Sequence, residues 1–588
     1  MKYLLFCLKL ILFLLIFIFL ELNKNTLLGY LLTGLLIGLY LYISNKYIDN
    51  GLKGFGLILL VILLFVGIVF LTWPPTKAIK AVDYDNPDKT EIITTNYGDI
   101  RGVVTKDKEA EVFAGIPYAK APVGDLRWKE PEEIDKWEGI LEADEYGPMS
   151  MQETNIPIVD SLTRIIGYHD YKISLKDNFV PPVSEDSLYL NIYRPTGEYN
   201  NLPVLVYVHG GSLNSGQTWY EDYNGVSLSK QGIIVVNMAY RLGVFGFYAD
   251  EQLVNESKNS TTGNYGLLDV ICSLNWIKNN IEYFGGDPNN ITLAGESAGS
   301  AIVSALCTSD LATGLFDRVV LESSTVVSKV PPHSYRSFID ALNSGKKIKE
   351  ELNVSSVEEL RKIDAKDLVK YSNSEHHITV DGYALNQDPY LSYLEGKHNE
   401  TKILHGYNAK ESGPFILFEK TTLNNYEDKL RNYFKEYTDD VLNLYNAKTD
   451  EEASDYWAQI YGAVFFNYPH YCLNRLANNS DIPVYEYYFN KDNGRLGSWH
   501  SGEEIYCYRN IPDDSKLFDE EDRQLSKIMS SYWLNFVKYG DPNGEGLVNW
   551  PINKDNKTLL EFNSVVKVID EKYIKLYEIL DKVYGYIE

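Results

Sequence analysis

A strand-like run meets a helix-like run with no loop between them in the stretch NITLAGESAGSAIVSALC, residues 290–307. The junction is Gly-Glu-Ser-Ala-Gly, with Ser297 at its centre. A tight strand-to-helix turn favours small residues, and Ser suits turns. The same junction can also hold a serine as a nucleophile on a strained elbow. The bare pattern Gly-x-Ser-x-Gly does not decide between the two, because a chain of this length contains about 0.2 such matches by chance.

Strand-like and helix-like segments alternate around this junction. The alternation predicts a mostly parallel sheet with helices on both faces, and in such sheets the chemistry collects at the carboxyl ends of the strands. A long helix is expected at 264–286, where apolar residues recur at helical spacing before a glycine stop. Strands are expected at 203–211, 232–241, 291–294, 317–323, 401–408 and 483–490.

A serine nucleophile requires a general base, an acid that orients the base, and N–H donors for the developing oxyanion. His-Gly-Gly-Ser at 209–212 follows a predicted strand, where small residues free backbone N–H groups; a plain turn is the alternative. In this kind of fold the chain order is Ser, acid, His, which favours a late histidine. His500 lies in a Gly/Ser-rich loop after a strand-like run, and it therefore ranks above His470 as the base.

The charge of the chain is uneven and acidic. The first eighty residues hold seven Lys and two acidic residues, whereas the whole chain carries −26, so the remaining residues carry −31. A domain this acidic repels phosphate backbones, which argues against a nucleic-acid partner. Five cysteines are too few for a disulfide scaffold, and neither Cys-x-x-Cys nor His-Glu-x-x-His occurs. We therefore expect no metal and no cofactor.

Three long apolar stretches occupy the amino-terminal region, at 3–20, 25–45 and 54–76. Each approaches the roughly 20 residues that a helix needs to cross a bilayer core, so we expect three membrane-spanning helices. A cleaved signal peptide is the alternative for the first stretch. The lysines that flank the three stretches are equally divided between the two sides of the membrane. Lys9 and the terminal amine add positive charge on the amino-terminal side. This predicts an internal amino terminus and a catalytic domain outside the cytoplasm, tethered to a cell membrane.

The remainder of the chain resembles the type-B carboxylesterase family, the cholinesterase-like branch of the α/β-hydrolases. The resemblance follows ordered blocks from about residue 97 to residue 551. They include FAGIPYAKAPVGDLRW (113–128), SEDSLYLNIYRP (184–195), VHGGSLNSG (208–216), YRLGVFGF (240–247), the helix and elbow region (264–300), GLFDRVVLESS (314–324), VDGY (380–383), WLNFVKYGDPNG (533–544) and NWP (549–551).

The resemblance implies a role for each matching residue. The nucleophile is Ser297, the acid is Glu411 within GYNAKESG, and the base is His500, which heads a His-x-x-acid block with Glu503. The implied oxyanion donors are the backbone N–H groups of Gly211, Ser212 and Ala298, and the supporting residues are Glu296 near the base and Ser323 beside the acid.

The chain departs from the family pattern at several positions. Lys410 and Ser412 stand where the family has Asp and Gly around the acid, and Ser212 replaces a third glycine. Ser150 and Ser187 stand where many members carry a bridged pair of cysteines, and the segment between them has no Trp of the kind that binds choline. A choline ester is therefore disfavoured as the substrate. We expect five free thiols. Cys472 and Cys507 are the one pair for which the sequence does not decide against a disulfide.

Together these features predict an α/β-hydrolase fold preceded by three transmembrane helices. The expected divisions are a membrane anchor at 1–80, a linker at 81–96 and the hydrolase domain at 97–588, with pocket walls from 151–183 and 325–379. The expected activity is hydrolysis of a small-molecule carboxylic ester through an acyl-enzyme. Two alternatives remain, an acyltransferase that uses the same residues and a catalytically silent adhesion or binding member of the family.

Overall fold

The computed structural model of the 588-residue chain describes residues 2–47, 51–82, 86–166, 173, 177–328, 335–372, 376–492 and 496–586. The chain divides into two compact units. Unit 1 comprises Met1–Ala78 and Thr154–Pro182, and unit 2 comprises Ile79–Glu153 and Val183–Glu588. Lys80, at the start of unit 2, pairs with Asp144 and Glu145, and part of the expected linker forms strand β1 (Ile93–Thr94).

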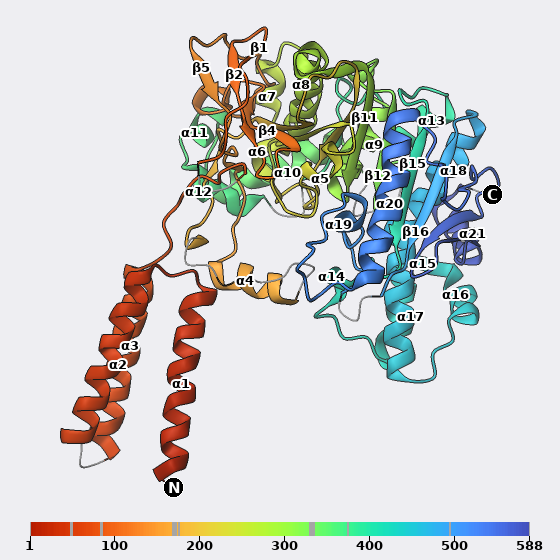
Figure 1. Cartoon of the computed structure of the whole chain (residues 1–588). Coiled ribbons are helices and arrows are strands. Elements are labelled where there is room, and N and C mark those ends of the chain that lie inside the picture. The colour runs from red at the N-terminus through yellow and green to blue at the C-terminus, as the bar shows by residue number, and fades with distance from the viewer. Residues whose placement is uncertain are drawn as a thin grey trace. The chain divides into compact units, whose positions relative to one another are not determined.

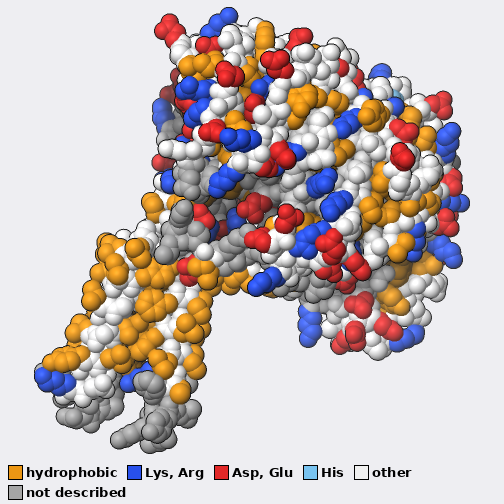
Figure 2. Space-filling view, in the orientation of Figure 1, with side chains coloured by type: hydrophobic (Ala, Val, Ile, Leu, Met, Phe, Trp, Pro, Cys, Tyr) orange, Lys and Arg blue, Asp and Glu red, His pale blue; other side chains and the backbone are white. Residues whose placement is uncertain are grey.

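Three long helices begin unit 1: α1 (Lys2–Leu22), α2 (Leu27–Tyr47) and α3 (Gly51–Leu71) (Figure 1). Their described faces are largely hydrophobic, whereas charges of both signs are mixed over the visible face of unit 2 (Figure 2). Over the described residues, Leu27–Lys46 and Gly54–Leu71 are long and apolar enough to cross a membrane. The span expected within α1 stays a prediction.

A buried polar contact joins the turn after α1 to the end of α3. The amide of Asn25 donates to Val69 O and to Thr72 Oγ1, both at 2.9 Å. Gly29 leaves room for this contact, since a Cβ there would lie 2.6 Å from Thr72 Oγ1. The second stretch of unit 1 contains α4 (Pro157–Ile166). Residues 154–182, which the sequence placed in the pocket wall, thus group with the amino-terminal helices.

An eleven-stranded sheet, counted over the described residues, forms the frame of unit 2. Strands β10, β9, β11, β12, β15, β16 and β17 run parallel, which agrees with the expected parallel sheet, while β8, β4, β3 and β18 add antiparallel edges. In sheet order the strands are β18 (Lys567–Asp570), β17 (Thr558–Phe562), β16 (Val484–Phe489), β15 (Ile403–Asn408), β12 (Arg318–Glu322), β11 (Gly286–Glu296), β9 (Leu202–Val208), β10 (Ile234–Met238), β8 (Tyr189–Pro195), β4 (Ala110–Pro117) and β3 (Val103–Val104).

Helices and small sheets complete unit 2. The short strands are β2 (Asp99–Arg101) and β5 (Ile140–Glu142) beside β1, β6 (Met149–Ser150) with β7 (Val183–Ser184), and β13 (Arg336–Ser337) with β14 (Thr379–Val380). The helices are α5 (Val226–Ser229), α6 (Gly243–Phe247), α7 (Glu251–Glu256), α8 (Tyr265–Asn280), α9 (Ala298–Cys307), α10 (Phe338–Leu352), α11 (Val357–Arg361), α12 (Ala365–Leu368), α13 (Pro389–Leu394), α14 (Gly413–Ile416), α15 (Leu423–Phe434), α16 (Thr438–Leu444), α17 (Asp450–Gly462), α18 (Tyr468–Asn479), α19 (Glu504–Cys507), α20 (Glu520–Tyr539) and α21 (Ile574–Tyr584).

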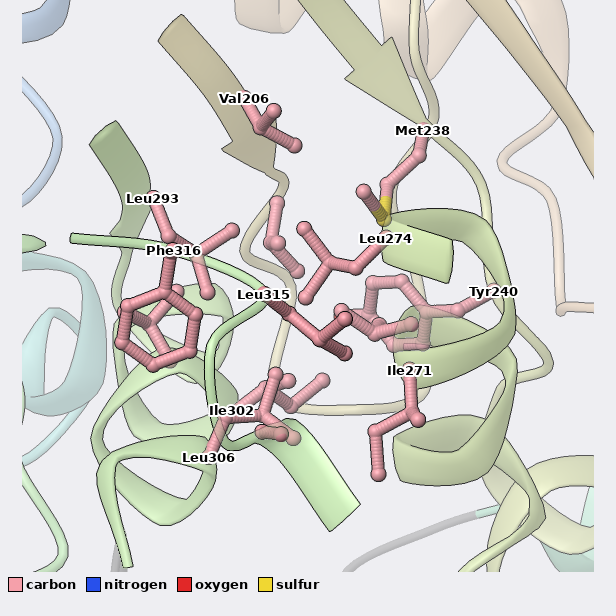
Figure 3. Packing of buried hydrophobic residues seen from close by; sticks show 14 of the residues in the cluster. Val206, Met238, Tyr240, Ile271, Leu274, Leu293, Ile302, Leu306, Leu315 and Phe316 are labelled. Atoms are coloured by element: carbon pink, nitrogen blue, oxygen red, sulfur yellow. The ribbon is translucent and has the colours of Figure 1, made fainter. Parts of the chain in front are cut away.

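The main hydrophobic core packs β9 and β11 against α8 and α9 (Figure 3). Val206 and Leu293 project from the two strands, while Leu274 and Ile302 come from the two helices, and all four are fully buried. Burying one such side chain contributes about 1.5–3 kcal/mol. The core therefore fixes α9, and with it the elbow that precedes α9.

All five cysteines are free thiols. Cys472 packs in the cluster around α17 and α21, whereas Cys507 Sγ contacts Glu322, so the pair that the sequence left open is not bridged. At the positions where many family members carry a disulfide, Ser150 Oγ donates to Ser187 Oγ over 3.0 Å. Both of these serines are buried.

We expect the double substitution Ser150→Cys and Ser187→Cys to form a disulfide. The two Oγ atoms already touch, and the bridge would close a loop between positions 37 apart. The loss of unfolded-chain entropy would stabilise unit 2 by about 4 kcal/mol at most. Mass spectrometry of the alkylated, unreduced protein and a thermal melt with and without reductant measure this. Ser150→Cys alone is the control. Five alkylated thiols in the oxidised double variant are expected, and seven would contradict the expectation.

Candidate active site

Ser297 occupies a strained turn between β11 and α9. Its backbone has φ 52° and ψ −122°, a conformation that L-residues rarely adopt. Both flanking positions must be glycine because a side chain would collide with the backbone. A Cβ on Gly295 would lie 2.6 Å from the carbonyl carbon of Gly299, and a Cβ on Gly299 would lie 2.0 Å from Val208 O. The Ser297 N–H donates to Glu322 O at 2.8 Å, which ties the turn to β12. The predicted elbow is thus present and packed tightly.

The structure brings Ser297, His500 and Glu411 into one hydrogen-bonded line. His500 Nε2 lies 2.9 Å from Ser297 Oγ, and His500 Nδ1 lies 2.5 Å from Glu411 Oε2. Ser297 is only 4% exposed and Glu411 only 1%. The hydroxyl, the imidazole and the carboxylate thus meet in a site from which most water is excluded.

Two further donors hold Glu411 in place. Its Oε1 accepts from the Asn408 N–H at 2.7 Å and from Ser323 Oγ at 2.6 Å. The other carboxylate oxygen, Oε2, therefore faces His500. Ser323 lies where the resemblance expected it, beside the acid. The departure at Lys410 leaves this contact intact, because its side chain turns away to Asp492 at 3.5 Å.

A second buried carboxyl, Glu503, lies behind Glu411. Its Oε1 accepts from Tyr487 OH at 3.1 Å and contacts Ser323 Oγ at 3.2 Å, and its Oε2 accepts from the Asn408 amide. Burial, with the negative charge of Glu411 added to it, raises the pKa of Glu503 to about 8. Burial thus favours the protonated form of Glu503 over that of an exposed glutamate.

Glu296 approaches His500 from the side of the nucleophile. Its Oε1 lies 3.2 Å from His500 Nε2 and accepts from Ser501 Oγ at 2.7 Å. Burial acts to lower the pKa of His500, but the charges of Glu296 and Glu411 outweigh it and raise that pKa to about 9. The two carboxylates that face the ring thus stabilise its protonated form.

Two aromatic rings flank the His500 imidazole, and the sequence did not predict either of them. The Phe415 and Phe466 ring centroids lie 5.1 and 4.9 Å from that of His500. Phe415 lies in α14, four residues after Glu411. This closeness in the chain could have predicted that Phe415 lies near the site. Phe466 lies in a π-helical turn, Ala463–Asn467, and no local pattern marks it.

The residues expected to supply oxyanion donors have N–H groups that are not used elsewhere. Within the described ranges, nothing accepts a hydrogen bond from the backbone N–H of Gly211, Ser212 or Ala298. Gly211 adopts φ 112°, and a Cβ there would lie 2.2 Å from Ser215 O. The Ser212 side chain is exposed, so replacing the third glycine leaves the donor available.

Gln152 fixes the far end of the loop that carries these donors. Its side chain donates to Gly216 O at 2.7 Å and accepts from Gly216 N at 3.0 Å. Gln152 was not predicted as a functional residue. A glutamine buried against a glycine-rich loop is recognisable only once the fold is known.

His470, the lower-ranked base, lies elsewhere. Its Nδ1 contacts His405 Nδ1 at 2.8 Å in a fully buried pair, and burial lowers the pKa of both rings. Over the part of the chain that the structure describes, no group of three His, Cys, Asp or Glu side chains could hold a metal ion.

The comparisons with known proteins identify the family of the chain. The Carboxylesterase family matches residues 89–576. Carboxylesterase 1C of Rattus norvegicus is 29% identical over 80% of this chain and 89% of its own length. Para-nitrobenzyl esterase of Bacillus subtilis is 30% identical over 78% of this chain and 92% of its own. Fumonisin B1 esterase of Sphingopyxis macrogoltabida is 30% identical over 80% and 86%.

Solved structures give the same result for the fold. A PNB esterase superposes with a TM-score of 0.70 at 27% identity, covering 83% of this chain and 99% of its own. A carboxylesterase of Geobacillus stearothermophilus gives 0.70 at 27% identity, covering 84% and 100%. The α/β-hydrolase fold of carboxylesterases is thereby confirmed, and the chain belongs to the Carboxylesterase family of ester hydrolases.

Proposed function

We propose that the chain is a membrane-anchored serine carboxylic-ester hydrolase that works through an acyl-enzyme on Ser297. The observation that carries the proposal is the line from Ser297 Oγ through the His500 ring to Glu411, next to the unused N–H groups of Gly211 and Ser212. A hydroxyl, a base and fixed donors in this order are what acyl transfer requires.

The reaction proceeds in two halves. In the first half, His500 Nε2 takes the Ser297 proton as Oγ attacks the ester carbonyl, and the three N–H groups stabilise the oxyanion. His500 then gives the proton to the departing alcohol, which leaves an acyl-Ser297. In the second half, His500 takes a proton from water as the water attacks the acyl carbon. It then returns the proton to Ser297 Oγ as the Oγ–acyl bond breaks and the carboxylic acid leaves. Glu411 orients the imidazole and stabilises its charged form throughout.

Two other functions use the same fold. A catalytically silent binding protein does not need a serine poised 2.9 Å from a histidine, so the geometry disfavours it. An acyltransferase differs only in the acceptor, and product analysis with an added alcohol separates it from a hydrolase. The substrate is a small carboxylic ester; the missing Trp between Ser150 and Ser187 disfavours a choline ester.

The anchor is part of this proposal. The apolar helices Leu27–Lys46 and Gly54–Leu71 support it, and α1 would supply a third span. Three spans place the amino terminus and the catalytic domain on opposite sides. The slight excess of positive charge towards the amino terminus favours a catalytic domain outside the cytoplasm.

We expect Ser297→Ala to abolish ester hydrolysis without unfolding unit 2. Removing the nucleophile of such a triad costs on the order of 10⁶ in kcat. His500→Ala should be as severe and Glu411→Gln less so, because Glu411 acts through His500. Rates on p-nitrophenyl esters and labelling by a fluorophosphonate measure the loss, with a thermal melt as the folding control. His470→Ala is the matched variant, and a tenth of wild-type activity in Ser297→Ala would rule out the mechanism.

We expect kcat/KM to rise with pH through a midpoint above the reference histidine value of ~6.5, because the base must be neutral and its pKa is raised to about 9. Glu296→Gln removes a negative charge 3.2 Å from Nε2 and should move the midpoint to lower pH. Glu138→Gln, an exposed carboxyl, is the control. An unchanged midpoint in Glu296→Gln would show that Glu296 does not act on the base.

We expect protease treatment of intact cells to remove the esterase activity without lysis. This follows from the outward orientation of the catalytic domain. Activity released from a cytoplasmic reporter enzyme is the control for lysis. Full protection of the esterase until the cells are lysed would reverse the orientation while leaving the catalytic proposal untouched.

A further inference from the structure

Helix α4 belongs to an insertion, residues 154–182, that leaves the hydrolase unit and joins the amino-terminal helices. A salt bridge ties it to them: Lys24 Nζ, just beyond the end of α1, lies 3.0 Å from Asp160 Oδ2 of α4. Arg164, one turn further along α4, lies 3.6 Å from the same carboxylate. One side of α4 is therefore polar and points towards the end of α1.

The returning part of the insertion is tied to the end of α3. Val180 pairs with Thr76, with Lys77 N donating to Val180 O and Val180 N donating to Pro75 O, both at 3.0 Å. Asn178 donates through its amide to Asn25 O, in the turn between α1 and α2. The described parts of the insertion are thus fastened at one level, where α1 ends, α2 begins and α3 ends.

The opposite side of α4 is apolar and exposed. Ile156, just before α4, is 53% exposed, and Leu162 is 45% exposed. The exposed apolar residues recur every third position, so each is a neighbour of the next on the helix surface. They are Ile156, Val159, Leu162 and Ile165. A helix with one charged and one apolar side, outside a packed core, is typical of helices that lie in a membrane interface.

The level of α4 matches the edge of the apolar surface on the long helices. On α3 the exposed apolar residues run to Phe70 and Leu71, and Trp73 and two prolines follow. Trp gathers at the boundary between lipid and water. Thr76, to which the insertion is paired, comes directly after this boundary. The apolar side of α4 therefore continues the apolar belt of the same unit.

We propose that α4 is a membrane-surface helix whose apolar side lies in the lipid headgroup boundary of the bilayer that the amino-terminal helices cross. The inference rests on the proposed anchor and adds a second, lateral attachment made by the hydrolase insertion. Asp160 and Arg164 stay on the polar side with Lys24, and Ile156, Val159, Leu162 and Ile165 contact lipid.

The test uses the full chain in phosphatidylcholine vesicles, in a Cys7→Ser, Cys272→Ser background so that the remaining thiols are buried. Single cysteines carry an environment-sensitive fluorophore: Leu162→Cys on the apolar side of α4 and Arg164→Cys on its polar side. Leu63→Cys, on an exposed face of α3, reports the span, and Glu545→Cys, exposed in unit 2, reports water. Lipids spin-labelled near the headgroup or at the chain end, and iodide in water, act as quenchers.

We expect the Leu162 fluorophore to be blue-shifted and quenched mainly by the headgroup label, the Leu63 fluorophore mainly by the chain-end label, and the Arg164 and Glu545 fluorophores mainly by iodide. Leu162 quenched by iodide as strongly as Glu545, with Leu63 protected, would overturn the surface helix and leave the anchor standing. Iodide quenching at Leu63 would instead show that the anchor itself fails. Val159→Cys repeats the measurement if the Leu162 label disturbs the helix.

Discussion

The close contact of α9 with the end of β9 is the constraint on which the site depends. Gly299 allows the helix to approach Val208 O, where any side chain would collide, and Gly295 allows the helix to fold back over the strand. With both glycines in place, Ser297 alone makes the turn and accepts a strained φ. Because β9 and β11 are parallel neighbours, the same approach sets Ser297 beside the loop that begins at His209.

The parallel sheet explains why the other parts of the site meet there. Ser323 follows β12, Glu411 follows β15, and His500 lies in the loop after β16, which are successive strands of the sheet. Their carboxyl ends meet at one edge, so residues up to 203 positions apart come within hydrogen-bonding distance. Gln152 joins the loop that carries Gly211 and Ser212 to the chain that runs on into the insertion.

Much of this arrangement is readable from the sequence, because it depends on local patterns and chain order. The elbow, the parallel strands and the choice of His500 over His470 follow from glycine spacing, alternation and the order of the catalytic groups. The position of Phe466 was not predicted, since it depends on a π-helical turn and on packing among helices distant in the sequence. The sequence analysis interpreted the insertion as pocket wall, although the amphipathic spacing of PIVDSLTRII predicts a helix with one apolar side. No local pattern in the insertion indicates that it contacts α1.

The direction of the hydrogen bonds around the acid follows from the buried protons. Ser323 has one hydroxyl proton and two carboxyl neighbours, Glu411 at 2.6 Å and Glu503 at 3.2 Å. If both carboxyls were charged, the single Ser323 proton could serve only one of them, and the other would face the hydroxyl oxygen with no proton between them. Burial and the charge of Glu411 raise the pKa of Glu503, which favours its protonated form, and the shorter contact gives the Ser323 proton to Glu411. With Oε1 occupied, Glu411 Oε2 is left to face His500 Nδ1. Through the shared Ser323 hydroxyl, the buried Glu503 carboxyl thus helps to orient Glu411 behind the imidazole.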